Sequence, residues 1–76
     1  MNKISELLTE INPDADFQSS IDYIKDYLLD SFDIMTLVAG LEEIFSINIQ
    51  INDILPENFK SLDSITDLVK KCGGTI

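Results

Sequence analysis

A serine lies between two acidic residues at the point where an amphipathic helix is predicted to begin. The stretch from Asp30 to Phe45 reads DSFDIMTLVAGLEEIF, and Ser31 is its second residue. Asp30 suits the N-cap of this helix, and Asp33 falls at its third position, where the helix dipole favours negative charge. The free amide N–H groups of a helix N-terminus can stabilise a phosphate attached to a serine there. Ser31 is therefore a candidate site of covalent modification.

The sequence provides no base beside Ser31 that could activate its hydroxyl. The chain has no histidine, and no lysine lies near Ser31 in the sequence. A serine nucleophile needs an adjacent base, so we predict no catalytic residue and no enzymatic activity, and a reaction at Ser31 must be catalysed by a partner. No metal site is expected either, because the chain has no histidine and only one cysteine. That cysteine, Cys72, is interpreted as a small buried hydrophobe.

The chain is strongly acidic. It has fourteen acids against five lysines, and its formal net charge is −9. Between Asp26 and Phe59 there are seven acids and no basic residue. Such a surface repels phosphate backbones, so we expect no nucleic-acid partner. It favours basic protein partners, since opposite fields steer encounter and raise association rates.

Length and composition predict a small protein of the cytoplasm. Seventy-six residues allow one domain, residues 1–76, with a small core. A single cysteine excludes an intramolecular disulfide, which favours a reducing compartment. No apolar run approaches the roughly 20 residues that cross a bilayer, and the first ten residues lack a signal-peptide pattern. We expect a soluble monomer that does not insert into membranes.

Three amphipathic helices are predicted from apolar residues at helical spacing. They cover residues 3–11, 30–45 and 62–72. Asn2 and Ser61 are available as caps of the first and last helix, and Gly73 ends the last one. The buried faces are expected to consist of aliphatic and aromatic side chains. These are Ile4, Leu7, Leu8, Ile11, Ile34, Leu37, Val38, Leu41, Ile44, Phe45, Leu62, Ile65, Leu68, Val69 and Cys72.

The remaining segments are predicted as connections. Residues 12–29 begin with turn formers and continue with an irregular apolar stretch, which we interpret as a long loop pinned to the core. Residues 46–53 alternate like a strand but have no second strand to pair with, so we expect an extended connector with Ile47, Ile49 and Ile51 in the core. Residues 54–59 can hold one short helix. The predicted fold is all-α, a small bundle of three main helices plus one short helix, with a long first loop.

The tetrapeptide Asp30-Ser31-Phe32-Asp33, followed by a helix that ends in LEEIF, resembles the signature of the acyl carrier proteins. The order of the predicted elements is similar to that family along nearly the whole chain. The resemblance implies that Ser31 carries 4′-phosphopantetheine, transferred from coenzyme A by a phosphopantetheinyl transferase. The thiol of this arm would hold acyl groups as thioesters, and the chain would deliver them to partner enzymes of fatty-acid, polyketide or related biosynthesis.

The resemblance also implies a docking surface on the second helix. Basic surfaces of the transferase and of acyl- or aminoacyl-loading and acyl-processing enzymes would contact its acidic and outward-facing side chains. The predicted contacts are Asp30, Phe32, Asp33, Met35, Thr36, Ala39, Glu42 and Glu43. Phe32 and Met35 are large apolar groups on a side of the helix predicted to be exposed, which is typical of an interaction surface.

Departures from the family pattern leave alternatives open. Leu28 and Leu29 stand where many carriers have a glycine, Phe32 stands in place of leucine, and Thr36 stands where glutamate is common. These differences favour a specialised carrier over a housekeeping fatty-acid carrier. The motif is also similar to that of aminoacyl carriers such as the D-alanyl carrier, which is one alternative. An alternative of another class is an unmodified acidic helical adaptor that binds a basic partner.

Overall fold

Three α-helices and two short 3₁₀ helices form the part of the chain that the computed structural model describes, residues 3–75. In chain order these are α1 (Lys3–Ile11), α2 (Ser31–Phe45), η1 (Ile51–Asp53), η2 (Pro56–Asn58) and α3 (Leu62–Lys71). No strand occurs within these residues, which confirms the predicted all-α class. Asn2, the expected cap of α1, lies outside the described residues.

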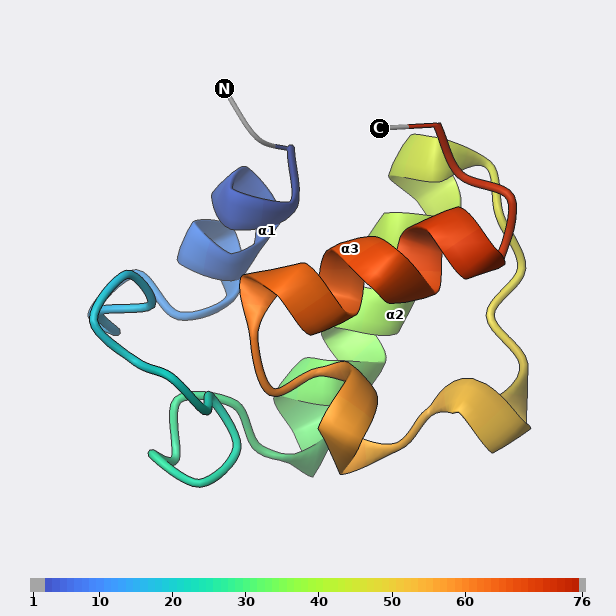
Figure 1. Ribbon diagram of the computed structural model, residues 1–76. Coiled ribbons are helices and arrows are strands. Elements are labelled where there is room, and N and C mark those ends of the chain that lie inside the picture. Colours follow the sequence, from blue (N-terminus) through green and yellow to red (C-terminus); the bar gives the residue numbers. More distant parts are fainter. Residues whose placement is uncertain (1–2, 76) are drawn as a thin grey trace.

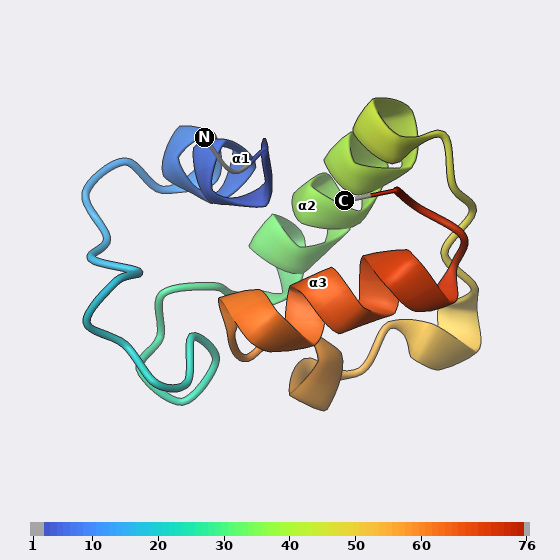
Figure 2. The same ribbon diagram turned by 45° about the horizontal axis from the view of Figure 1, so that its top comes forward.

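The helices cross one another and meet at a shared core. In Figure 1, α3 crosses in front of α2, and α1 contacts both. Figure 2 again shows the axes of α2 and α3 running in different directions. The radius of gyration of the Cα atoms is 11.2 Å, close to the value of about 11 Å expected for a compact chain of this length. The structure is therefore a compact globule of crossing helices.

One cluster of apolar side chains holds the three helices together. Each helix contributes three buried residues that the sequence predicts correctly, namely Ile4, Leu7, Leu8, Leu37, Val38, Leu41, Ile65, Leu68 and Val69. Among the described residues, no polar or charged residue is buried. Burial of apolar surface contributes roughly 25 cal/mol per Å², so this cluster is the main stabilising feature of the fold.

Residues 12–30 contain turns and no helix, and two of their side chains enter the core. Tyr23 and Leu29 are 4% and 3% exposed. The ring of Tyr23 packs edge to face against Phe17 at 5.0 Å, and burial raises the pKa of its phenol. The Tyr23 amide donates to the carbonyl of Lys60 at 2.6 Å. These contacts pin the segment against the chain that leads into α3.

The connector after α2 differs from the prediction at its end. Ile49 is buried as expected, but Ile51 is 84% exposed, so its prediction as a core residue is wrong. The reason is that η1 begins at Ile51. The Ile54 amide donates a hydrogen bond to the Ile51 carbonyl at 3.0 Å. This turn ends the alternation of inward and outward side chains.

An ion pair ties η1 to the end of α3. Lys71 Nζ donates a hydrogen bond to Asp53 Oδ1 at 2.8 Å, and this bond raises the pKa of Lys71.

Other predicted core positions are only partly buried. Ile44, predicted on the buried stripe of α2, is 41% exposed and faces a hollow beside α1. Cys72 packs against the edge of the core and is half-buried. Phe59, which the sequence did not single out, is fully buried. The predicted short helix around Pro56 is a single 3₁₀ turn, so the described residues contain no fourth α-helix.

Substitution of the two neighbouring isoleucines of the connector should separate a core position from a surface position. Ile49→Ala should lower the free energy of unfolding by about 2–5 kcal/mol, because it leaves a cavity in the core. Ile51→Ala, the matched control, should change it by less than about 0.5 kcal/mol. Urea unfolding followed by circular dichroism measures both values. Equal losses for the two variants would contradict the observed register.

Candidate functional site

Ser31 is the first residue of α2 and is exposed to solvent. The preceding residue, Asp30, is the N-cap, as predicted. Its Oδ1 accepts a hydrogen bond from the Asp33 amide at 2.8 Å, and Asp33 Oδ2 accepts one from the Asp30 amide at 3.3 Å. This reciprocal pair is a capping box, which stabilises a helix start by satisfying two amides at once. It fixes Ser31 at the N-terminus of α2.

The electrostatics of this helix start suit an anion attached to Ser31. The amides of Ser31 and Phe32 occupy the first two helical positions, where α-helical geometry supplies no acceptor within the helix. Together with the positive end of the helix dipole they can stabilise a phosphate. The carboxylates of Asp30 and Asp33 each accept a bond from a backbone amide, so both are engaged in the capping box.

A small apolar hollow lies beside Ser31. Its volume is about 250 Å³, and it is lined by Ser31, Ile34, Met35, Ile54, Leu55 and Pro56. The first turns of α2 form one side, and the segment between η1 and η2 forms the other. The sequence predicted exposure for Met35 but gave no signal that Ile54 to Pro56 would face Ser31. A flexible group attached to Ser31 would therefore meet apolar surface next to its attachment point.

The predicted docking residues fall on α2 and its cap, and most of them are exposed. Phe32 and Met35 are 79% and 56% exposed, as the sequence predicts. The exposed set also contains Asp30, Thr36, Ala39 and Glu43. Asp33 is half-buried at the capping box. Acidic and apolar groups thus share the outer side of α2.

Glu42 differs from the other predicted docking residues because it has a structural contact. It is half-buried, and its Oε2 accepts a hydrogen bond from the Ile49 amide at 2.9 Å. The bond joins α2 to the connector seven residues further along the chain. The sequence gave no indication of this hydrogen bond, because the spacing of apolar residues places Glu42 on the solvent-facing side of the helix.

Residues in the left-handed region flank both ends of α2. Tyr27, in the turn before the helix, has φ 61°, and Ser46, its C-cap, has φ 55°. Ser46 donates its amide to the carbonyl of Glu42, which is the usual way to close a helix end. The ring of Tyr27 is 92% exposed. Neither residue is a glycine, the residue that adopts this conformation without strain.

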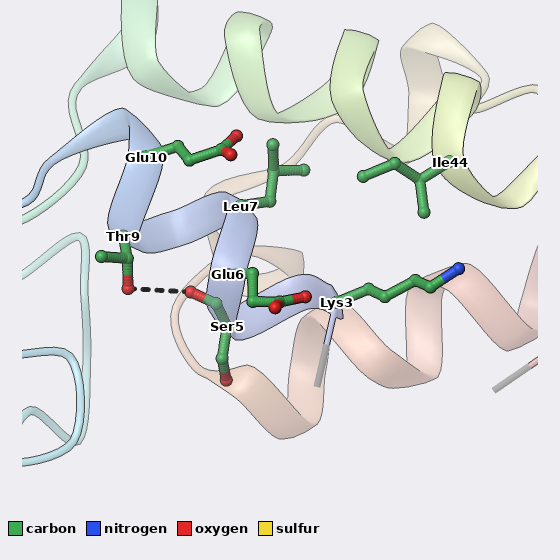
Figure 3. Close-up of a pocket in the computed structure, with 7 residues that line it drawn as sticks. All are labelled: Lys3, Ser5, Glu6, Leu7, Thr9, Glu10 and Ile44. Atoms are coloured by element: carbon green, nitrogen blue, oxygen red, sulfur yellow. Dashed lines mark hydrogen bonds between the residues drawn. The ribbon is translucent and has the colours of Figure 1, made fainter. Parts of the chain in front are cut away.

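Another hollow lies between α1 and the C-terminal part of α2. Figure 3 shows Leu7 pointing from α1 toward α2 and Ile44 pointing into the space between the helices. The hollow has a volume of about 760 Å³, and charged residues of α1 rim it, among them Lys3 and Glu6. Ile44 lies thirteen positions after Ser31, about 20 Å along the helix axis. This hollow is therefore separate from the site at Ser31.

Within residues 3–75, no group of three or more acidic or cysteine side chains is placed to hold a metal ion. None of the helices in the same range combines the length and apolar character needed to cross a membrane.

No protein-family model, curated protein or solved structure matches the chain. Inference about its function therefore starts from Ser31 and its surroundings.

The capping box can be tested with paired substitutions. Asp30→Ala should lower the free energy of unfolding by about 0.5–2 kcal/mol, because the Asp33 amide loses its acceptor. Asp30→Asn keeps an acceptor and caps equally well, so it should lose much less. Thermal or urea unfolding measures the difference. A loss as large for Asn as for Ala would show that charge, and not the cap, is what Asp30 contributes.

Relief of the left-handed strain beside α2 should stabilise the protein. Tyr27→Gly and Ser46→Gly should each raise the free energy of unfolding by about 0.5–1 kcal/mol. A non-glycine residue in the left-handed conformation costs roughly 1–2 kcal/mol, and the greater conformational entropy of glycine in the unfolded chain offsets part of the relief. Tyr27→Ala keeps a Cβ in the same conformation and should give no such gain. Urea unfolding compares the three variants, and destabilisation by Tyr27→Gly would contradict the strain.

Proposed function

We propose that this protein is an acyl carrier protein. Residues 1–76 form a carrier domain that holds acyl intermediates as thioesters on 4′-phosphopantetheine attached to Ser31. It delivers them to partner enzymes of fatty-acid, polyketide or related biosynthesis. The observation that carries this proposal is an exposed serine at the first position of a capped helix, beside an apolar hollow. The DSFD motif, whose two acids form this cap, carries the resemblance to acyl carrier proteins that supports the proposal.

The residues around Ser31 fit a phosphodiester-linked arm. The hydroxyl is on an exposed residue, so a transferase can reach it. The amides of Ser31 and Phe32 and the helix dipole favour the phosphate charge. Asp30 and Asp33 direct one carboxylate oxygen each to the backbone, which lessens their repulsion of a neighbouring anion. When bound, the group supplies the thiol on which acyl cargo is held.

The chain itself recognises partners and leaves the chemistry to them. No histidine is present in the sequence, so Ser31 depends on the transferase for its activation. Asp30 and Glu43 attract basic partner surfaces, while the exposed side chains of Phe32 and Met35 provide apolar contact. Under this proposal the protein is a cytoplasmic monomer and a substrate of its partners, not an enzyme.

The proposal predicts a specific change in mass. Incubation with coenzyme A and a broad-specificity phosphopantetheinyl transferase should raise the intact mass by one phosphopantetheine group, and Ser31→Ala should abolish the gain. Ser46→Gly, which changes an exposed serine at the other end of α2, should be modified like the wild type. An unchanged wild-type mass, or a gain that survives in Ser31→Ala, would overturn the proposal.

The modified protein and the Ser31→Ala variant also distinguish between the alternative functions. Loading of the modified protein by an amino-acid adenylating enzyme would identify an aminoacyl carrier, such as a D-alanyl carrier. Transfer of a malonyl group from malonyl coenzyme A to the modified protein would identify a carrier of fatty-acid or polyketide biosynthesis. An unmodified acidic adaptor would show no mass gain, and its binding to a basic partner would be the same in Ser31→Ala as in the wild type.

A further inference from the structure

Tyr27 combines a strained backbone with a side chain that makes little contact with its own chain. Its φ of 61° lies in the left-handed region, and its ring is 92% exposed. An aromatic ring normally stabilises a protein by burial, so this ring adds almost nothing to the core. Residues held in strained conformations cluster at functional positions, because the surrounding structure must maintain them.

Backbone hydrogen bonds hold the turn around Tyr27, and one of them runs from the Tyr27 amide to the Ile24 carbonyl at 3.1 Å. The amides of Leu28 and Leu29 both donate to the carbonyl of Tyr23, at 2.8 and 3.3 Å. Tyr23 is in turn bonded to Lys60 through its amide, and both Tyr23 and Leu29 are buried. These bonds join backbone groups, so they do not depend on the Tyr27 side chain. Glycine or asparagine would suit that conformation better than tyrosine.

Tyr27 lies close enough to Ser31 to share a partner with it. The two residues are four positions apart in the sequence, so their Cα atoms are at most about 14 Å apart. A standard protein interface covers about 800 Å² on each partner, which is a patch roughly 30 Å across. Phe32, 79% exposed, directly follows Ser31. Two exposed aromatic side chains thus stand on either side of Ser31 in the sequence.

The charge around Tyr27 defines the chemistry of the partner. Four acids lie within six residues of it, Asp22, Asp26, Asp30 and Asp33, against one lysine, Lys25, so the local charge is negative. This field attracts a basic protein surface. Arginine guanidinium groups and lysine ammonium groups bind favourably over a tyrosine ring, and tyrosine is enriched among the residues that dominate interface energies.

We propose that Tyr27 is an aromatic anchor for the basic enzyme that modifies Ser31, with a cationic side chain of that enzyme packed against its ring. The inference rests on the proposed function, since it extends the docking surface of α2 onto the turn that precedes it. It assigns to that turn a recognition role that the sequence pattern did not indicate.

Initial rates of Ser31 modification test the inference, with a broad-specificity phosphopantetheinyl transferase and coenzyme A as the probe and intact mass as the readout. Tyr27→Gly and Tyr27→Asn should each lower kcat/KM by about 5- to 30-fold, the loss typical of an interface anchor. Tyr27→Phe keeps the ring and should stay within about 2-fold of the wild type. Ser46→Gly is the matched control, because it relieves the same strain far from Ser31, and its rate should equal that of the wild type.

The outcomes are distinguishable from failure of the proposed function. Because Tyr27→Gly is expected to stabilise the fold, a slower reaction in that variant cannot be attributed to unfolding, which circular dichroism verifies. Wild-type rates for Tyr27→Gly and Tyr27→Asn would overturn the inference and leave the carrier proposal intact. A wild-type protein that gains no mass at all would overturn both.

Discussion

Two hydrogen bonds between Asp30 and Asp33 determine where α2 begins, and the arrangement of the rest of the chain depends on that point. The capping box makes Ser31 the first helical residue and leaves the neighbouring amides free of intrahelical acceptors. The apolar face of α2 then sets the rotation of the helix, because this face packs in the shared core. Leu37 and Leu41 are fully buried in the core that α1 and α3 share with α2, whereas Asp30 and Glu43 are exposed.

Hydrogen bonds fix the segments on both sides of α2. Before the helix, the bond between Tyr23 and Lys60 fixes the turn that contains Tyr27. After it, the bond from Ile49 to Glu42 fixes the connector behind Ser46. Each of these contacts supports a left-handed residue that local preference alone would disfavour. The fold thus maintains strain on both sides of its central helix, and only one of these sites is near Ser31.

The sequence by itself determined the features that depend on neighbouring residues. A cap and a helix dipole act within one turn, so Asp30 and Ser61 could be recognised as helix starts from their own surroundings. The buried faces follow from the helical period, which is why the three core residues of each helix were predicted correctly. Ser31 as the candidate site follows from the same local pattern.

Only the tertiary structure decided the features that depend on segments far apart in the chain. The alternating pattern of the connector predicted Ile51 in the core, but the turn at η1 places it in solvent. Phe59 is buried in the core shared by the three helices, and the hollow beside Ser31 forms where residues 54–56 lie against the start of α2. The conformation of Tyr27 is likewise set by the anchored carbonyl of Tyr23. The hydrophobic pattern of the sequence shows which residues are apolar. Whether each of them is buried depends on which other segments of the chain pack against it.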